Sequence, residues 1–247
     1  MRTFTRCRTK TIQAVKLATS TLQNFLYPKY CFECKCLLNS FEETLCLGCI
    51  QNLPVKKTNY NSYSDIKLRL WGRVPVKHTY SLLVLKNNSV KRIIYQFKYY
   101  NNITLGLKLS QLMAEDFKSQ FHQIKSNQLF DGIIPMPIHY NKLKKRGFNQ
   151  SLLIAETLSK ELNIPVYKNS IIKNRNEKSQ TTLNSWKRWE NRKGDFEVIC
   201  KDLLKNKHIL IVDDIITSGA SIEALYQSLL SISGFSISVC CLAISEN

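Results

Sequence analysis

The sequence predicts an α/β fold in which helices flank a mostly parallel sheet, with a small cysteine-rich module before it. In the second half of the chain, short apolar segments alternate with segments whose apolar residues recur at helical spacing, and this alternation implies βαβ units. One apolar segment, 208–212 (HILIV), is typical of a central strand buried on both faces. The cysteine-rich module is predicted from five of the nine cysteines, which lie between positions 31 and 49.

Four segments follow one another along the chain. Residues 1–30 are a basic leader, in which apolar residues of 11–27 recur at helical spacing and predict a short amphipathic helix. The cysteine module covers 31–54, a linker without clear periodicity covers 55–78, and the α/β domain covers 79–247. These boundaries follow the end of the cysteine cluster and the start of the periodic pattern.

Within the α/β domain, the spacing of apolar residues predicts the order of the elements. Proline stiffens the chain where the second strand (DGIIPMPI) runs into a loop. The predicted strands cover 80–85, 131–138, 208–212 and 237–244. The predicted helices cover 90–97, 105–113, 150–162 and 220–230.

The composition limits the class of protein. Hydrophobic residues make up 44% and charged residues 22% of the chain, as in ordinary globular proteins, which disfavours disorder of the whole chain. No apolar run reaches the ~18 residues of a membrane helix, and the leader lacks the apolar core of a secretory signal, so we expect a cytoplasmic protein. The net charge of +18 indicates a polyanionic partner or a phosphorylated ligand. A genome that favours Lys, Asn and Ile would also give this charge.

The cysteine cluster predicts a structural zinc site. Cys31-x-x-Cys34 and Cys46-x-x-Cys49 supply two pairs of thiols separated by eleven residues, and the two-residue gap lets both sulfurs of a pair reach one tetrahedral ion. Four protein ligands leave no open position for chemistry, so the ion would fold a segment too small to bury its own core. Cys36 is a fifth thiol that either replaces Cys34 or lies nearby, and an iron–sulfur cluster is the alternative occupant.

The most informative segment follows the apolar run at 208–212. Two adjacent carboxylates, Asp213 and Asp214, come directly after this run, and a loop of hydroxyl residues around Gly219 then leads into a helix. At the carboxyl end of a parallel strand, the N–H groups of a helix N-terminus suit a phosphate. The carboxylates suit sugar hydroxyls or Mg²⁺ held through water. The alternative, a helix cap beside two exposed acids, leaves the paired acids after a buried strand unexplained.

This segment resembles the phosphoribosyl pyrophosphate (PRPP) binding motif of type I phosphoribosyltransferases. The resemblance implies the fold of that class, and it implies that Asp213 and Asp214 hold the ribose 2- and 3-hydroxyls at the catalytic centre, with Mg²⁺ bound alongside PRPP. Serine stands at two positions where threonine is frequent in the motif, and it keeps the hydroxyl. The loop that would bind the ribose 5-phosphate consists of Thr217, Ser218, Gly219, Ala220 and Ser221.

Further motifs resemble the ComF (competence protein F, GntX-like) family, which carries a four-cysteine knuckle before a phosphoribosyltransferase-type domain. The match runs in the same order over residues 25–245. It implies a part in natural DNA uptake or DNA processing in the bacterial cytoplasm, with single-stranded DNA and competence or DNA-processing proteins as partners. The motifs are FKY at 97–99, DGIIPMP at 131–137, RGFNQ at 146–150, and Gln180-x-x-Leu183 followed by Arg188, Asn191 and Phe196.

Residues on three segments are expected around the pyrophosphate of PRPP. Pro135 and Pro137 stiffen the loop after the second strand, and the resemblance assigns this loop to the pyrophosphate. Lys145 and Arg146 end a run of cations that suits a diphosphate, although a solvated basic turn would have the same sequence. The resemblance adds Lys98 of the FKY motif to this set.

The polar segment 173–194 combines aromatic and basic residues. In phosphoribosyltransferases a flexible loop at this point closes over the reacting centre. Aromatic and basic side chains together also suit single-stranded nucleic acid, whose bases stack on rings. Alternatively, the two tryptophans, which are at helical spacing, pack on the domain. The nucleic-acid candidates are Trp186, Lys187, Arg188, Trp189 and Arg192.

Two functions from different classes follow from these observations. The first is a DNA-handling protein that binds PRPP and Mg²⁺ and acts in DNA uptake. The second is an enzyme resembling an amidophosphoribosyltransferase, which would transfer the ribose 5-phosphate of PRPP to a nitrogenous acceptor and release pyrophosphate. The motifs suggest the donor, whereas segments outside them would contact the acceptor.

Overall fold

The chain folds as two compact units, Met1–Leu53 and Pro54–Asn247. The helix predicted within 11–27 and the nucleic-acid candidates at 186–192 lie outside the described residues. The computed structural model describes residues 27–55, 65–100, 102–121, 129–174 and 195–246.

The described part of the first unit contains a cysteine-rich turn followed by a short helix, α2 (Leu47–Gln51). Tyr30 and Leu37 pair in an isolated antiparallel bridge, and the chain between them turns at Lys35, whose φ of 62° is left-handed. A core of only a few residues needs a further source of stability, which small domains commonly obtain from a metal ion or disulfides. The buried apolar residues described in this unit are Cys31, Leu38, Leu45 and Leu53.

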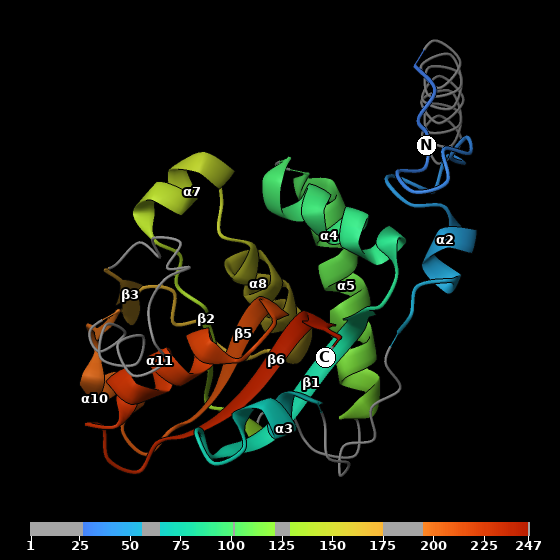
Figure 1. Cartoon of the computed structure of the whole chain (residues 1–247). Helices are drawn as coiled ribbons and strands as arrows, with labels where there is room; N and C mark the ends of the chain where they lie inside the picture. Colours follow the sequence, from blue (N-terminus) through green and yellow to red (C-terminus); the bar gives the residue numbers. More distant parts are fainter. Residues whose placement is uncertain (1–26, 56–64, 101, 122–128, 175–194, 247) are drawn as a thin grey trace, which may run out of the picture. The chain divides into compact units, whose positions relative to one another are not determined.

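The second unit is built on a four-stranded sheet in which all neighbouring strands are parallel (Figure 1). The strands lie in the order β1–β6–β5–β2. The two central strands, β5 and β6, have near-continuous apolar sequences, as expected of strands covered on both faces. The bounds are Val76–Leu85 for β1, Gly132–Pro135 for β2, His208–Ile216 for β5 and Ser236–Ser245 for β6.

Helices cover both faces of this sheet (Figure 1). One face carries α4 (Asn88–Tyr99), α5 (Ile103–Gln120) and α8 (Gln150–Leu162). The other face carries α3 (Asp65–Leu70) and α11 (Ala220–Leu229), whose apolar residues share one buried cluster with the sheet. Within the described part of the chain, no helix has both the length and the apolar character needed to cross a membrane. The remaining elements are α7 (Tyr140–Arg146), α10 (Lys201–Leu204) and an antiparallel pair, β3 (Ile171–Lys173) and β4 (Phe196–Val198).

The helices on the first face begin at asparagines. Asn87, Asn102 and Asn149 each accept a hydrogen bond from a backbone N–H in the first turn of α4, α5 and α8, respectively. Asparagine is among the best N-cap residues because its side-chain oxygen satisfies an amide that the helix leaves unpaired. The cap at Asn149 fixes the start of α8, so that Gln150 and Ser151 lie at a pocket beside the end of β5.

The packing of α4 on α5 depends on a glycine in the middle of α5. A Cβ atom at Gly106 would lie 2.3 Å from Cε2 of Phe97 and 2.9 Å from Cδ2 of Leu153. Both distances are too short for real contacts. Gly106 therefore allows α4, α5 and α8 to approach one another closely at this point.

Each predicted strand and helix of the α/β domain has a counterpart in the structure, although β2 ends at Pro135 and not at 138. Three further differences have physical causes. β5 continues beyond residue 212 because its pairing with β6 extends to Ile216 and Ile244. The basic run at 142–146 belongs to helix α7, which ends at Gly147 with a left-handed φ of 79°. The segment 55–78, predicted as a linker, contains α3 and the first residues of β1.

Candidate functional site

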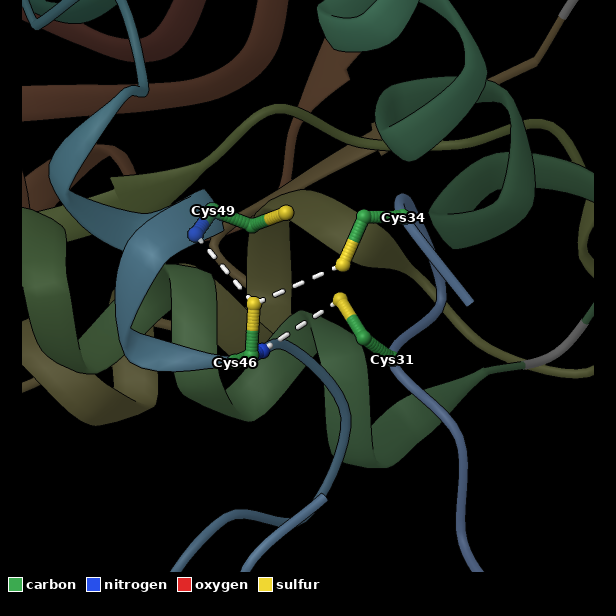
Figure 2. A group of neighbouring side chains, drawn as sticks. All are labelled: Cys31, Cys34, Cys46 and Cys49. Carbon is green, nitrogen blue, oxygen red and sulfur yellow. Dashed lines mark hydrogen bonds between the residues drawn. The ribbon is translucent and has the colours of Figure 1, made fainter. Parts of the chain in front are cut away.

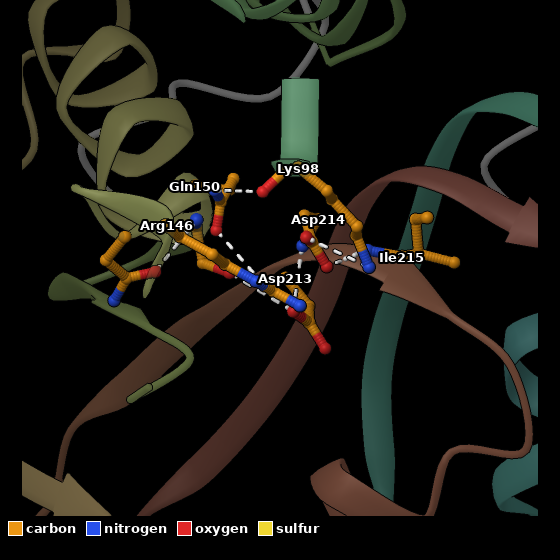
Figure 3. Close-up of polar contacts among 8 residues, drawn as sticks. Lys98, Arg146, Gln150, Asp213, Asp214 and Ile215 are labelled. Atoms are coloured by element: carbon orange, nitrogen blue, oxygen red, sulfur yellow. Dashed lines mark hydrogen bonds and ion pairs between the residues drawn. The ribbon is translucent and has the colours of Figure 1, made fainter. Parts of the chain in front are cut away.

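Two adjacent carboxylates lie near the carboxyl end of β5. Asp213 is half-buried and Asp214 is 7% exposed. The sequence placed them after the strand, but they lie within it because Asp213 still pairs with Cys241 of β6. Figure 3 shows the pair facing side chains from α4, α7 and α8.

Each carboxylate is fixed by hydrogen bonds. Oδ1 of Asp213 accepts from the hydroxyl of Ser151 at 3.1 Å and from the backbone N–H of Asp214 at 2.8 Å. Oδ1 of Asp214 accepts from the backbone N–H of Ile215 at 2.6 Å, and its Oδ2 lies 3.1 Å from Nζ of Lys98. The first turn of α8 and the end of α4 therefore hold the two acids in place.

The two acids are not equivalent in charge. Burial raises the pKa of Asp213 to about 7, and the neighbouring charge of Asp214 acts in the same direction. The Lys98 ammonium and the hydrogen bonds from Asp214 and Ser151 oppose this rise. Since strongly interacting carboxyls titrate as a pair, the site gains negative charge as the pH rises through neutrality.

Gln150 connects the three helices around the carboxylates. Its Nε2 donates to the carbonyl oxygen of Lys98 at 3.3 Å, and its Oε1 accepts from a guanidinium nitrogen of Arg146 at 3.2 Å (Figure 3). The Arg146 guanidinium also lies over the ring of Tyr99, 5.2 Å from its centroid. Gln150, which is 1% exposed, thus holds the Arg146 guanidinium and the backbone of Lys98 at the start of α8.

A pocket of about 150 Å³ lies in front of the carboxylates. The loop after β2 forms one wall, from Met136 to His139, and Asn149 Nδ2 donates to the carbonyl oxygen of Met136 at 3.1 Å. Lys142 and Lys173 add cations to the lining. The pocket therefore combines an anionic base with cationic walls, which suits a ligand bearing both hydroxyl and phosphate groups.

The backbone of the loop before α11 accepts hydrogen bonds from two arginines, one in α3 and one in the turn that follows α3. A guanidinium nitrogen of Arg69 donates to the carbonyl oxygen of Thr217, and one of Arg73 donates to that of Ser218 at 2.9 Å. Arg73 also pairs with Glu223 of α11 at 2.7 Å. Gly219 caps α11 with a left-handed φ of 78°. These bonds turn two carbonyl groups toward the arginines and away from the loop interior.

The structure brings some of the predicted site residues to the pocket and leaves others outside its lining. Pro135 is buried within β2, and Lys145 is exposed on α7. Thr217, Ser218, Gly219 and Ala220 belong to the loop and the first position of α11. The predicted residues that line the pocket are Lys98, Pro137, Arg146, Asp213, Asp214 and Ser221.

Several residues at the site were not predicted. Asn149 and Gln150 belong to the RGFNQ motif, so their position was marked in the sequence although their contacts were not. Ser151 follows this motif directly but belongs to no motif itself. Arg69 and Arg73 lie about 150 positions before the loop that they hold, and no spacing rule connects residues so far apart.

The first unit places the four predicted metal ligands together. Their thiol sulfurs all lie within 4.8 Å of one another (Figure 2). A tetrahedral zinc ion with Zn–S distances of about 2.3 Å requires sulfurs about 3.8 Å apart, so the cluster fits such an ion. Backbone N–H groups support the sulfurs, from Cys46 to Cys31 at 3.3 Å and from Cys49 to Cys46 at 3.4 Å.

Cys36 lies beside this cluster. Its sulfur is 3.2 Å from that of Cys34, but the group whose ligand atoms all come together consists of Cys31, Cys34, Cys46 and Cys49. Hydrogen bonds from the backbone and thiol of Cys36 lower the pKa of Cys34 to about 6. A group that ionises readily is the better ligand, because metals bind the thiolate.

Comparison with known proteins confirms the predicted resemblance to the ComF family. Competence protein F of Haemophilus influenzae is 25% identical over 211 residues, which cover 81% of this chain and 90% of that protein. DNA utilization protein YhgH of Escherichia coli O157:H7 is 29% identical over 152 residues, covering 61% of this chain and 65% of that protein. Competence protein ComFC of Bacillus subtilis is 25% identical over 61% of this chain and 60% of its own length. No family model matches the sequence.

Solved structures similar to the chain include phosphoribosyltransferases. A purine phosphoribosyltransferase from Pyrococcus horikoshii Ot3 matches with a TM-score of 0.32 and 18% identity, covering 67% of this chain and 77% of its own. UMP synthase of Leishmania donovani matches with a TM-score of 0.32 and 21% identity over 55% of this chain and 22% of its own. The α/β class itself follows from the parallel sheet and the helices on both its faces.

Proposed function

We propose that the protein binds PRPP together with Mg²⁺ and serves DNA uptake or DNA processing. The observation that carries this proposal is the pairing of Asp213 and Asp214 at the base of a cationic pocket, beside a left-handed glycine that begins α11. A phosphorylated sugar needs both kinds of group, since its hydroxyls donate to carboxylates and its phosphates accept from cations and helix N-terminal amides.

The ligand's parts would bind to different elements. Asp213 and Asp214 would accept from the ribose hydroxyls, and the 217–221 loop would hold the 5-phosphate. Arg146 and the loop after β2 would face the pyrophosphate. Carboxylate oxygens are ligands that Mg²⁺ prefers, in company with substrate phosphates, so the two acids fit this ion. When bound, Mg²⁺ would neutralise the diphosphate charge.

Lys98 would change its ionic partner when the ligand binds. It holds Asp214 in an ion pair whose side chains are 19% and 10% exposed, respectively. A ribose hydroxyl or a magnesium-bound water that approaches Asp214 competes with the ammonium. The displaced ammonium is then close to the pyrophosphate, which it can neutralise. Lys98 would therefore act as a counter-ion for Asp214 before binding and for the ligand afterwards.

The proposed role in DNA handling is supported by the relatives. Two are named competence proteins and one a DNA utilization protein. The net charge of +18 is compatible with a polyanionic partner. We also propose that the four cysteines of the first unit hold a structural zinc ion. Their close spacing suits a single ion better than a multi-iron cluster, which would hold the sulfurs further apart.

Titration calorimetry of PRPP with Mg²⁺ tests the ligand. We expect binding to the wild-type protein and a loss of at least about tenfold in affinity, or about 1.4 kcal/mol, in Asp213→Asn/Asp214→Asn. Asp202→Asn, at an exposed aspartate of α10, is the matched control and should bind like the wild type.

Absence of binding to folded wild-type protein would contradict the proposal. The same sample also tests the enzymatic alternative, because release of pyrophosphate after addition of ammonia would show that the ligand is turned over.

A further inference from the structure

Three tyrosines form an exposed aromatic cluster at the end of α4. Tyr95, Tyr99 and Tyr100, called here the tyrosine cluster, are 53%, 47% and 62% exposed. The ring centroid of Tyr95 lies 4.6 Å from that of Tyr99 and 5.9 Å from that of Tyr100. The core side of the same helix is already supplied by Val90, Ile93, Ile94 and Phe97. The tyrosine cluster is therefore not required by the packing of α4.

The tyrosine cluster adjoins the pocket. Lys98, which precedes Tyr99, reaches Asp214 at the pocket base, and Arg146 places its guanidinium over the Tyr99 ring while also lining the pocket. A ligand stacked on these rings would therefore lie next to the pocket. The contact between Tyr99 and Arg146 brings the end of α4 beside the end of α7.

The segments that contain α4 and α7 carry charges of one sign. The segments 86–114 and 132–155 contain nine Lys and Arg residues and no Asp or Glu. On α4, Lys91 and Arg92 are exposed, and on α7, Lys144 and Lys145 are exposed. An ordinary surface mixes both signs of charge. A surface with aromatic rings and cations alone offers stacking for bases and counter-charges for phosphates.

We propose that the tyrosine cluster and the cations of α7 bind single-stranded DNA. Bases stack on the rings of Tyr95, Tyr99 and Tyr100, and the backbone phosphates follow α7. A duplex hides the faces of its bases, so exposed rings select a single strand. This inference rests on the proposed function, and it names the surface on which the DNA partner binds beside the PRPP pocket.

Fluorescence anisotropy with a labelled oligo-dT of about 20 nucleotides tests the surface, with variants that separate stacking from apolar area. Tyr95→Phe/Tyr100→Phe keeps both rings and should bind like the wild type. Tyr95→Leu/Tyr100→Leu keeps apolar area but loses the rings, and we expect its affinity to fall about tenfold or more. Lys144→Gln should lower the slope of log K against log salt by about 0.7, as expected for one lost phosphate contact.

The readouts distinguish this inference from the proposed function. Calorimetry with PRPP should give the same affinity for the Leu variant as for the wild type, which also shows that the variant is folded. Equal DNA binding by the Leu and Phe variants overturns the inference and leaves PRPP binding standing. Tighter binding of an RNA oligonucleotide of the same length would assign the surface to RNA and would also overturn it.

Discussion

Asp213 lies in the proposed binding site, where its charged form is unfavourable for the fold. Its carboxyl is half-buried beside a second carboxyl, and both conditions favour the protonated form. A group with no ligand to bind would be more stable as a neutral side chain here. Functional residues commonly carry such a cost.

The stability of Asp213→Asn should therefore depend on pH relative to the wild type. The unfolded carboxyl ionises near 3.8 and the folded one near 7. Between these values the folded state binds more protons, so Asp213 destabilises the wild type increasingly as the pH rises through this window. We expect Asn to stabilise the protein by about 1–3 kcal/mol at pH 8 and to have little effect at pH 3.5. Urea denaturation at both pH values measures this difference.

Asp202→Asn is the control for this prediction. Asp202 is exposed on α10, and the ion pair with Lys205 lowers its pKa. Its replacement should give no stabilisation at pH 8. A gain of equal size in both variants, or a gain for Asp213→Asn that is independent of pH, would contradict the role of the Asp213 carboxyl.

The sequence predicted the site residues that belong to recognisable motifs, with Lys98, Pro137 and Arg146 added by the family resemblance, and it missed residues whose contacts depend on the packing of distant segments. Asp213, Asp214 and Ser221 come from one strand and the helix after it, so their proximity follows from local structure. Gln150 and Arg69 act by donating hydrogen bonds to backbone carbonyl groups of distant segments. Such contacts are decided by how the layers pack.

At the scale of elements, most helices and strands followed from periodicity, and the exceptions had no periodic signal. α3 has only six residues, DIKLRL, and is held through buried Ile66 and Leu70. α7 buries none of its residues. Short helices of this kind depend on tertiary contacts and end caps more than on sequence pattern.

The close packing of α4, α5 and α8 makes Gly106 a sensitive position of α5. Gly106→Ala improves helix propensity by about 1 kcal/mol, but its Cβ would overlap the Phe97 ring. We expect a net destabilisation of about 1–3 kcal/mol, as for other overpacked cores, measured by chemical denaturation. PRPP affinity should fall as well, because Phe97 adjoins Lys98.

Leu107→Ala is the matched control in the next position. Leu107 is 39% exposed, and its truncation should change stability by less than about 1 kcal/mol. A Gly106→Ala variant more stable than the wild type would show that α4 can shift without loss, and it would contradict the importance of this contact.

At the scale of the whole molecule, the two units draw their stability from different sources. The second has a large apolar core between its layers, whereas the first buries few apolar residues and brings four thiols together. Metal binding in such a module is coupled to its folding. We therefore expect a chelator to unfold the first unit and leave the second one folded.

Native mass spectrometry measures the bound zinc, and limited proteolysis measures which of the two units unfolds. The protein should contain one zinc ion, and chelation should make residues 27–53 sensitive to protease while the second unit stays resistant. Cys34→Ser should lose the zinc, and Cys36→Ser should retain it, because Cys36 lies outside the group of four sulfurs. Zinc loss in Cys36→Ser and not in Cys34→Ser would exchange the roles of these two residues.

The parallel pairing of β1 with β6 also affects how the protein is made. Tyr80 of β1 pairs with Cys240 of β6, 160 residues later in the chain. At roughly 5–20 residues per second, a ribosome needs roughly 8–30 s to make the intervening segment. During this interval the apolar residues of β1 lack their native partner strand. The nascent chain can therefore aggregate through β1 during this interval. A chaperone that covers β1 would raise the yield of folded protein, and slower synthesis would lengthen the interval.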